Sequence, residues 1–155
     1  MNDIGESINI LRASRQNYLK FIDWYDLDAL NHTPTKFNNN LVWNFGHVIV
    51  THQLLCYKLS DLDMPIDKSL VPKYRKGTKP EAPVSQQEVS ELKELAVELV
   101  DKFEEDYNRG IFKVYNAYQT SYGFKIEDIQ DAVAFNNVHE GLHIGSCLAI
   151  MKFLD

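Results

Sequence analysis

The distribution of proline is the feature of this sequence that most constrains its fold. Four of the five prolines fall in one segment, residues 60–85, with the sequence SDLDMPIDKSLVPKYRKGTKPEAPVS. Proline lacks a backbone N–H, and its ring clashes with the preceding turn of a helix. This segment therefore cannot form a regular helix, and we interpret it as a long connection that crosses from one end of a helical bundle to the other.

Four segments outside this connection carry apolar residues at steps of three and four, the spacing typical of amphipathic or buried helices. They are residues 3–24, 41–59, 85–107 and 126–154. The third begins with Ser85 and has Glu88 three residues later, the pattern of a capping box. The sequence thus predicts an all-α four-helix bundle with a long crossover loop between helices two and three. We expect residues 1–155 to form a single domain, in which residues 108–128 are either a short strand pair or an ordered loop.

Charge and apolar content exclude several classes of partner. The chain has 16 basic and 22 acidic residues and a net charge of −6, which repels nucleic acid phosphates and anionic lipid headgroups. No apolar run approaches the roughly 20 residues that span a bilayer, and acidic residues stand at the N-terminus where a signal peptide would be basic. Cys56 and Cys147 are far apart and suggest neither a disulfide framework nor a zinc site. We expect a cytoplasmic protein with no nucleic acid or membrane partner.

The segment VHEGLHIG, residues 138–145, contains the strongest chemical signal. His139 and His143 are four residues apart, so on a helix both side chains project to one side and can share a metal ion. The pattern H-E-x-x-H is also that of zinc metalloproteases, which take a third ligand from further along the chain. Only twelve residues follow His143, and the position of a third metzincin histidine holds Ala149. The third ligand is therefore expected upstream.

Three upstream histidines are available: His32, His47 and His52. His52 follows His47 by five residues, which rotates it by about 140° around a helix, so both cannot face one point. We favour His47 because it lies near the start of its helix, beside Gly46, which permits close approach of another backbone. His52 is expected to be a surface or interface residue.

The sequences LVWNFGHVIVTHQLL and GFKIEDIQDAVAFNNVHEGLHIGSCLAIMKFL resemble the DinB/YfiT-like superfamily of metal-binding four-helix proteins. The resemblance spans essentially the whole chain. It implies a facial metal triad made by one histidine of helix two and an H-x-x-x-H pair of helix four, here His47, His139 and His143. Members commonly have a glycine two residues after the last histidine, often followed by glutamine. This chain keeps Gly145 but has Ser146 next.

The resemblance also implies a reaction: transfer of a low-molecular-weight thiol to an electrophile, or metal-dependent hydrolysis of a small molecule. A Zn²⁺, Ni²⁺ or Fe²⁺ ion held by three neutral imidazoles would keep its full charge and acidify a water or thiol in its open positions. The alternative is a non-enzymatic helical module that binds metal structurally and forms a homodimer. We expect a homodimer in either case, through apolar surface on helix two.

Several further residues flank the predicted site. Glu140 is interpreted as a residue that orients an imidazole or lies on the helix surface, with general-base catalysis as the alternative. Asn44 and Asn136 each precede a predicted ligand by about one turn, and they are expected to donate hydrogen bonds beside the metal. Four basic residues of the long connection form either a solvated loop or a rim that binds phosphate or carboxylate. They are Lys73, Arg75, Lys76 and Lys79.

Overall fold

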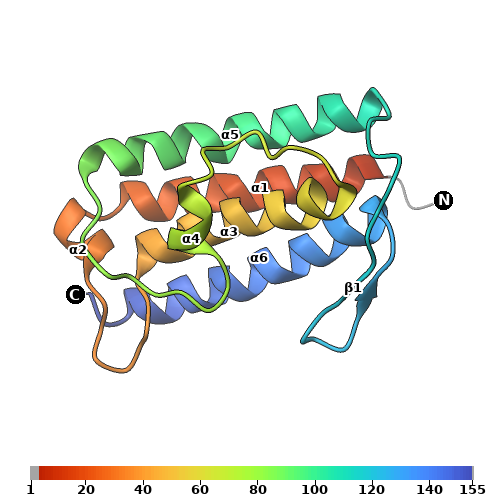
Figure 1. Cartoon of the computed structure of the whole chain (residues 1–155). Helices are drawn as coiled ribbons and strands as arrows, with labels where there is room; N and C mark the ends of the chain where they lie inside the picture. Colours follow the sequence, from red (N-terminus) through yellow and green to blue (C-terminus); the bar gives the residue numbers. More distant parts are fainter. Residues whose placement is uncertain (1–3, 155) are drawn as a thin grey trace.

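Four long helices lie side by side in the computed structural model, which describes residues 4–154 (Figure 1). They are α1 (Ile4–Asp23), α3 (Leu41–Cys56), α5 (Gln86–Asn108) and α6 (Ile129–Met151). Shorter elements join them: α2 (Leu27–Asn31), η1 (Lys58–Ser60), α4 (Leu70–Tyr74), β1 (Tyr118–Gln119) and β2 (Lys125–Ile126). The all-α class predicted from the sequence is confirmed. Residue 3, the first of the expected first helix, lies outside the described residues, as does residue 155.

Side-chain caps set where three of the long helices begin. Asn40, Ser85 and Asp128 each accept a hydrogen bond from the backbone N–H three residues later. These oxygens satisfy N–H groups that have no partner within the helix. The Ser85 cap confirms half of the predicted capping box, because the Glu88 carboxylate accepts from Lys73 and Tyr74 instead of folding back. The Asp128 cap makes α6 start three residues later than the sequence suggested.

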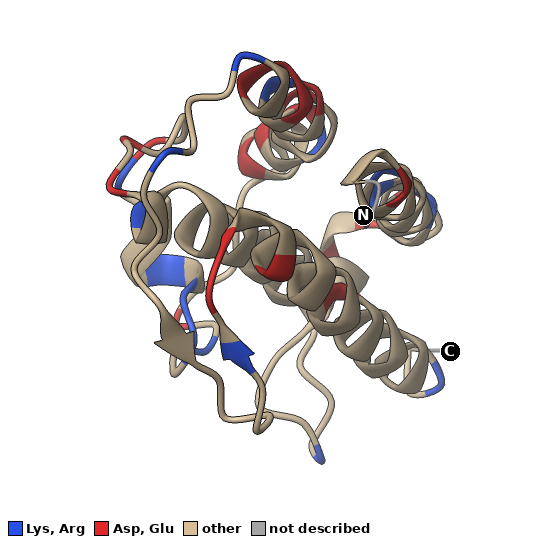
Figure 2. Cartoon of the chain, turned by 90° about the vertical axis from the view of Figure 1, so that its right-hand side faces the viewer, with Lys and Arg blue, Asp and Glu red and all other residues tan. Residues whose placement is uncertain are grey.

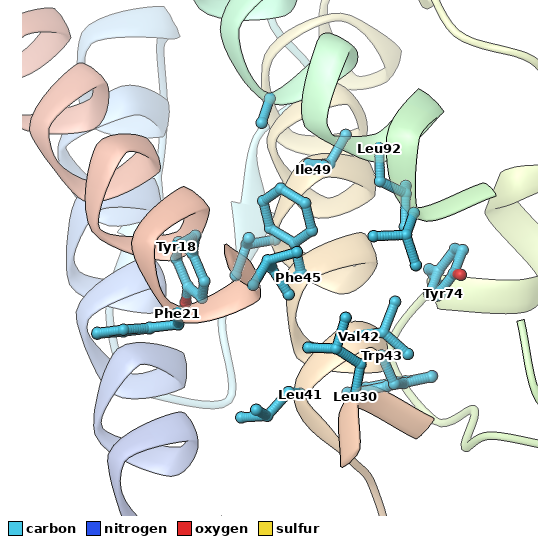
Figure 3. Packing of buried hydrophobic residues seen from close by; sticks show 14 of the residues in the cluster. Tyr18, Phe21, Leu30, Leu41, Val42, Trp43, Phe45, Ile49, Tyr74 and Leu92 are labelled. Atoms are coloured by element: carbon cyan, nitrogen blue, oxygen red, sulfur yellow. The ribbon is translucent and has the colours of Figure 1, made fainter. Parts of the chain in front are cut away.

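Helix α3 is the central element of the core. It packs against α6, α4 and α5, and α1 packs mainly on α6 with fewer contacts to α3. Figure 3 shows Phe45 and Ile49 of α3 between Tyr18 of α1 and Leu92 of α5, all of them buried. Nearly every side chain of α3 is interior, so the apolar surface expected on helix two for self-association is absent from α3. The homodimer itself stays a prediction.

The proline-rich connection, residues 60–85, returns to the end of the bundle at which α3 began. Consequently α3 and α5 run in the same direction, and α1 and α6 run in the opposite one (Figure 1). The connection contains one short helix, α4, which the sequence did not predict. Pro72 lies in the first turn of α4, where the backbone N–H groups have no partner within the helix and proline is tolerated.

Residues 118–126 form a small hairpin near the start of α6. β1 pairs with β2 in antiparallel register, with Tyr118 opposite Ile126. Gly123 adopts a φ of +86° in the turn, a conformation that costs glycine little. The strands have only two residues each. Residues 108–128 therefore contain both expected structures, a short strand pair and an ordered loop. Within residues 4–154, no helix has the length and apolar character needed to cross a bilayer.

Candidate metal centre

Three histidines from two helices converge on one point. His47 comes from α3, and His139 and His143 come from α6. One nitrogen of each ring lies within 4.8 Å of the others, and the Nε2 atoms of His47 and His139 are 3.1 Å apart. Nitrogens that bind one ion at about 2.1 Å are spaced by roughly 3 Å. The His47–His139 pair has this separation, and His143 lies within 4.8 Å of both. The predicted convergence of the three histidines is confirmed.

Two of the rings are held in the tautomer that a metal needs. Nδ1 of His47 lies 2.6 Å from the carbonyl oxygen of Tyr74, and Nδ1 of His143 lies 2.7 Å from Oδ1 of Asn44. The amide nitrogen of Asn44 donates to the carbonyl of Asn40, so Oδ1 is the acceptor atom. Carbonyl oxygens only accept, hence each Nδ1 carries the proton and each Nε2 presents its lone pair to the centre.

The orientation of the third ring, that of His139, is held by fewer contacts. Nδ1 of His139 is buried and has no hydrogen-bond partner among the described residues. Its position follows from packing in α6 and from the His47 and His143 rings, whose centroids lie 5.0 and 4.6 Å away. The plane of Trp43 stacks on His47 at 4.6 Å. The triad therefore has two rings oriented by hydrogen bonds to carbonyl oxygens, and a third, His139, whose polar contact is Nε2 of His47 at 3.1 Å.

All three imidazoles are neutral at pH 7. Burial, followed by the neighbouring His143 and His47, lowers the pKa of His139 to about 3. Burial and the charge of His47 lower the pKa of His143 to about 4. Burial also lowers the pKa of His47, against the opposing effect of the Tyr74 carbonyl. Desolvation disfavours the imidazolium form, and the neutral ring is the form that binds a metal.

The triad lies in the wall of a cavity of about 520 Å³. The cavity runs between α3 and α6, under the loop at Lys76 and the hairpin. Its lining residues are Asn39, Trp43, His47, Thr51, Leu54, Leu55, Lys58, Leu59, Lys76, Gly77, Tyr118, Thr120, Ser121, Phe135, His139 and His143. This volume lies in the range typical of small-molecule sites.

A comparison with known families agrees with this geometry. The family sequence model of the DinB superfamily matches residues 10–147, which are most of the chain. The chain belongs to the DinB superfamily. No protein of curated function matches the sequence significantly. The family resemblance noted in the sequence is thereby confirmed, and the three-histidine group of this DinB-superfamily protein agrees with the triad that the resemblance implied.

Glu140 of this DinB chain faces away from the triad. Its carboxylate is fully buried and paired with Arg15 of α1, at 2.8 Å from Nη2, and also accepts from Asn136. Placement on the helix surface is therefore wrong, and the carboxylate has no hydrogen bond to an imidazole. Catalysis by Glu140 stays a prediction, and it would require the carboxylate to leave the buried pair. Asn136 supports Glu140 and not the metal centre, whereas Asn44 lies beside the centre as an acceptor.

His52 is the clearest error of the sequence interpretation. It was expected at a surface or interface, yet its side chain is fully buried and packs edge-on against Phe103 at 5.1 Å. Burial holds its pKa well below the usual range, with a further contribution from Arg15. The reason is the central position of α3, on which every direction around the helix faces the interior.

Several residues of the site went unrecognised in the sequence. Thr51 and Phe135 line the cavity one turn from His47 and His139, so helical spacing could have identified both. Arg15 is a charged residue within the apolar stripe of helix one, a signal that could also have identified it. Tyr74 had no such signal. Its ring packs where a Cβ of Gly46 would lie, 2.5 Å from ring atoms, so the close approach predicted at Gly46 is made by a side chain.

Proposed function

We propose that this DinB-superfamily protein binds a divalent metal ion through His47, His139 and His143 and acts on a small molecule as a metal-dependent enzyme. The observation that carries the proposal is the set of three neutral imidazoles at the wall of an open cavity. Imidazole donors suit Zn²⁺, Ni²⁺ and Fe²⁺ alike, so the metal is one of these late first-row ions. When bound, such an ion supplies a Lewis acid that lowers the pKa of a thiol or water.

The protein's own residues would hold the substrate and exclude water. The Trp43 ring covers His47 on one side, and Leu54, Leu55 and Phe135 give the cavity an apolar wall. A dry, shaped cavity strengthens electrostatic interactions within it. Of the two reactions that the family resemblance suggests, we place transfer of a low-molecular-weight thiol first and hydrolysis second.

A structural metal in a non-enzymatic module is the competing function. Structural zinc sites usually have four protein ligands and are closed, whereas catalytic sites have three and keep one position open. Within residues 4–154, the group contains three potential ligands from His, Cys, Asp and Glu, and it borders a cavity. This arrangement supports the enzymatic function.

Metal binding can be tested with purified metal-free protein titrated with Zn²⁺ against a chromophoric chelator. We expect one ion per chain and loss of stoichiometric binding in His139→Ala. His32→Ala is the matched control, because His32 is exposed and outside the triad. Stoichiometric binding in His139→Ala would show that the assigned site is wrong.

The reaction can be tested with the Zn²⁺-loaded protein, a small thiol such as cysteine and the fluorogenic electrophile monobromobimane. We expect conjugation faster than the uncatalysed rate, with the increase abolished in His139→Ala and retained in His32→Ala. A loaded protein that accelerates neither thiol conjugation nor hydrolysis of small esters and amides would favour the structural alternative.

A further inference from the structure

The charge of the cavity is opposite to that of the chain. The chain carries a net charge of −6, yet no Asp or Glu is among the cavity-lining residues, while Lys58 and Lys76 are. Much of the acidic surface lies on α5, away from the hairpin (Figure 2). A cleft lined by one sign of charge concentrates ligands of the opposite sign. The excess of positive charge at this site is therefore a local property of the cavity.

Lys76 provides charge close to the triad. Its Nζ lies 3.0 Å from Oγ of Ser121, which joins the long connection to the hairpin above the cavity. Within residues 4–154, neither Lys76 nor Lys58 forms an ion pair with an acidic side chain. Lys76 lines the same cavity as His47, His139 and His143. Its charge is therefore available to a ligand that occupies the cavity beside the triad.

The rest of the cavity is long and apolar. On α3 and η1 the lining residues follow one face of the helix from Trp43 to Lys58, a rise of roughly 22 Å at 1.5 Å per residue. This face presents Leu54 and Leu55 before Lys58 and Leu59 after it, and Phe135 of α6 also lines the cavity. Such a wall favours an apolar chain or ring over a polar one.

We infer that the cavity binds an elongated small molecule that has an apolar body and an anionic group, a carboxylate or a phosphate, held by Lys76 beside the triad. This inference rests on the proposed function, since it names the class of substrate that the metal centre would act on. The apolar body lies along the leucine wall, which extends from the triad towards Lys58. The protein thereby selects anions although its overall charge repels them.

The inference can be tested without metal. In the Trp24→Phe background the remaining tryptophan is Trp43 in the cavity wall, so its fluorescence reports binding. The probes are octanoate, octyl phosphate, octan-1-ol and octylammonium, which share one apolar chain. We expect octanoate or octyl phosphate to bind at least tenfold more tightly than the alcohol, and octylammonium to bind most weakly. The ratio of the two anions distinguishes a carboxylate from a phosphate substrate.

Variants assign the effect to the cavity. Lys76→Met should weaken binding of the anion about tenfold and leave the alcohol unchanged, whereas Lys76→Arg should retain the preference. Lys68→Met is the matched control, because Lys68 is exposed in the same connection and does not line the cavity. Equal affinity for anion and alcohol, or an equal loss of anion binding in Lys68→Met, would overturn the inference. Because the probes bind metal-free protein, anion preference without Zn²⁺ binding would refute the proposed function alone.

Discussion

The carbonyl oxygen of one asparagine determines which nitrogen His143 offers to a metal. Asn44 Oδ1 holds the proton on Nδ1 of His143, and the buried amide has no freedom to turn because its nitrogen donates to Asn39 and Asn40. Partners of this kind fix the orientation and the basicity of a metal-binding imidazole. The triad therefore depends on a residue that touches no metal.

Replacing this asparagine should weaken metal binding. We expect Asn44→Leu to lower Zn²⁺ affinity by about 10- to 100-fold, the range found for partners of metal-binding histidines. Asn44→Asp keeps an acceptor for His143 but loses the amide donor to Asn39 and Asn40, so it should retain more affinity than Asn44→Leu. Competition titration with a chromophoric chelator measures both. Identical affinities for Asn44→Leu and the wild type would contradict the assigned tautomer.

His52 should make the stability of the protein depend on pH. Burial holds its pKa well below the usual value of 6.5 in the folded protein, whereas the unfolded chain retains that usual value. Below pH 6.5 the unfolded state binds a proton that the folded state excludes, so lowering the pH favours unfolding. At pH 5.5 this single residue should reduce the free energy of unfolding by about 1.4 kcal/mol relative to pH 7.5.

Urea unfolding of the metal-free protein at the two pH values measures this effect. The triad histidines bind protons as well, so the wild type is compared with His52→Leu. This variant removes only the proton-binding group at residue 52. The pH-dependent loss should be smaller in His52→Leu by about 1.4 kcal/mol, whatever its stability at pH 7.5. Equal losses in the two proteins would show that residue 52 is accessible to protons.

At the scale of the elements, one buried arginine connects α1 to the two helices that carry the three histidines. Arg15 of α1 binds the Glu140 carboxylate of α6 through Nε and Nη2, and Nη2 also donates to the Val48 carbonyl of α3. Val48 follows His47 and Glu140 follows His139 in the sequence. Arg15 therefore fixes the spacing of α3 and α6 at the level of the ligands, on the side opposite the cavity.

Breaking this pair should destabilise the fold strongly. We expect Arg15→Met to lower the free energy of unfolding by about 3–5 kcal/mol, because it leaves the Glu140 charge buried without a partner. The double variant Arg15→Met/Glu140→Leu removes both charges and should recover most of this loss. Arg12→Met is the control, since Arg12 pairs with exposed carboxylates of α5 and should change stability by less than about 1 kcal/mol. A double variant as unstable as Arg15→Met would contradict this account.

The sequence predicts those elements whose stability depends on local pattern. The four long helices follow from apolar spacing and from the absence of proline, and the Ser85 cap follows from a local motif. Helix α4 and the position of Tyr74 do not, because they depend on contacts with distant residues such as Glu88 and Gly46. Burial of His52 is different, because the residues one turn away on its face are the apolar Val48, Ile49, Leu55 and Cys56, so helical spacing could have predicted it.

At the scale of the whole molecule, the triad joins two helices that are far apart in the sequence. His47 and His139 are separated by 92 positions. Helical periodicity paired His139 with His143, and the place of His47 near the start of its helix, together with the family resemblance, identified it as their partner. The prediction succeeded because α3 and α6 are regular, so an i, i+4 pair had to face inward or outward as a unit. The cavity above the triad was beyond prediction, because loops and a hairpin provide its roof and their paths depend on tertiary contacts.

A metal bound at this junction should stabilise the entire fold. A ligand that binds the folded state alone adds RT ln(1 + [L]/Kd) to the free energy of unfolding, about 2.7 kcal/mol at a concentration of 100 Kd. For a chain of this length, this corresponds to a rise in Tm of roughly 5–10 °C. Removal of the metal with a chelator should reverse the rise, which differential scanning calorimetry measures.

Two variants separate bridging of the helices from nonspecific binding of the ion. His139→Ala should show the same Tm with and without Zn²⁺, because the α6 side of the bridge is broken. His32→Ala retains the triad and should show the full rise. A similar rise in His139→Ala would place the stabilising ion elsewhere on the chain, whereas no rise in the wild type would mean that the ion does not hold α3 and α6 together.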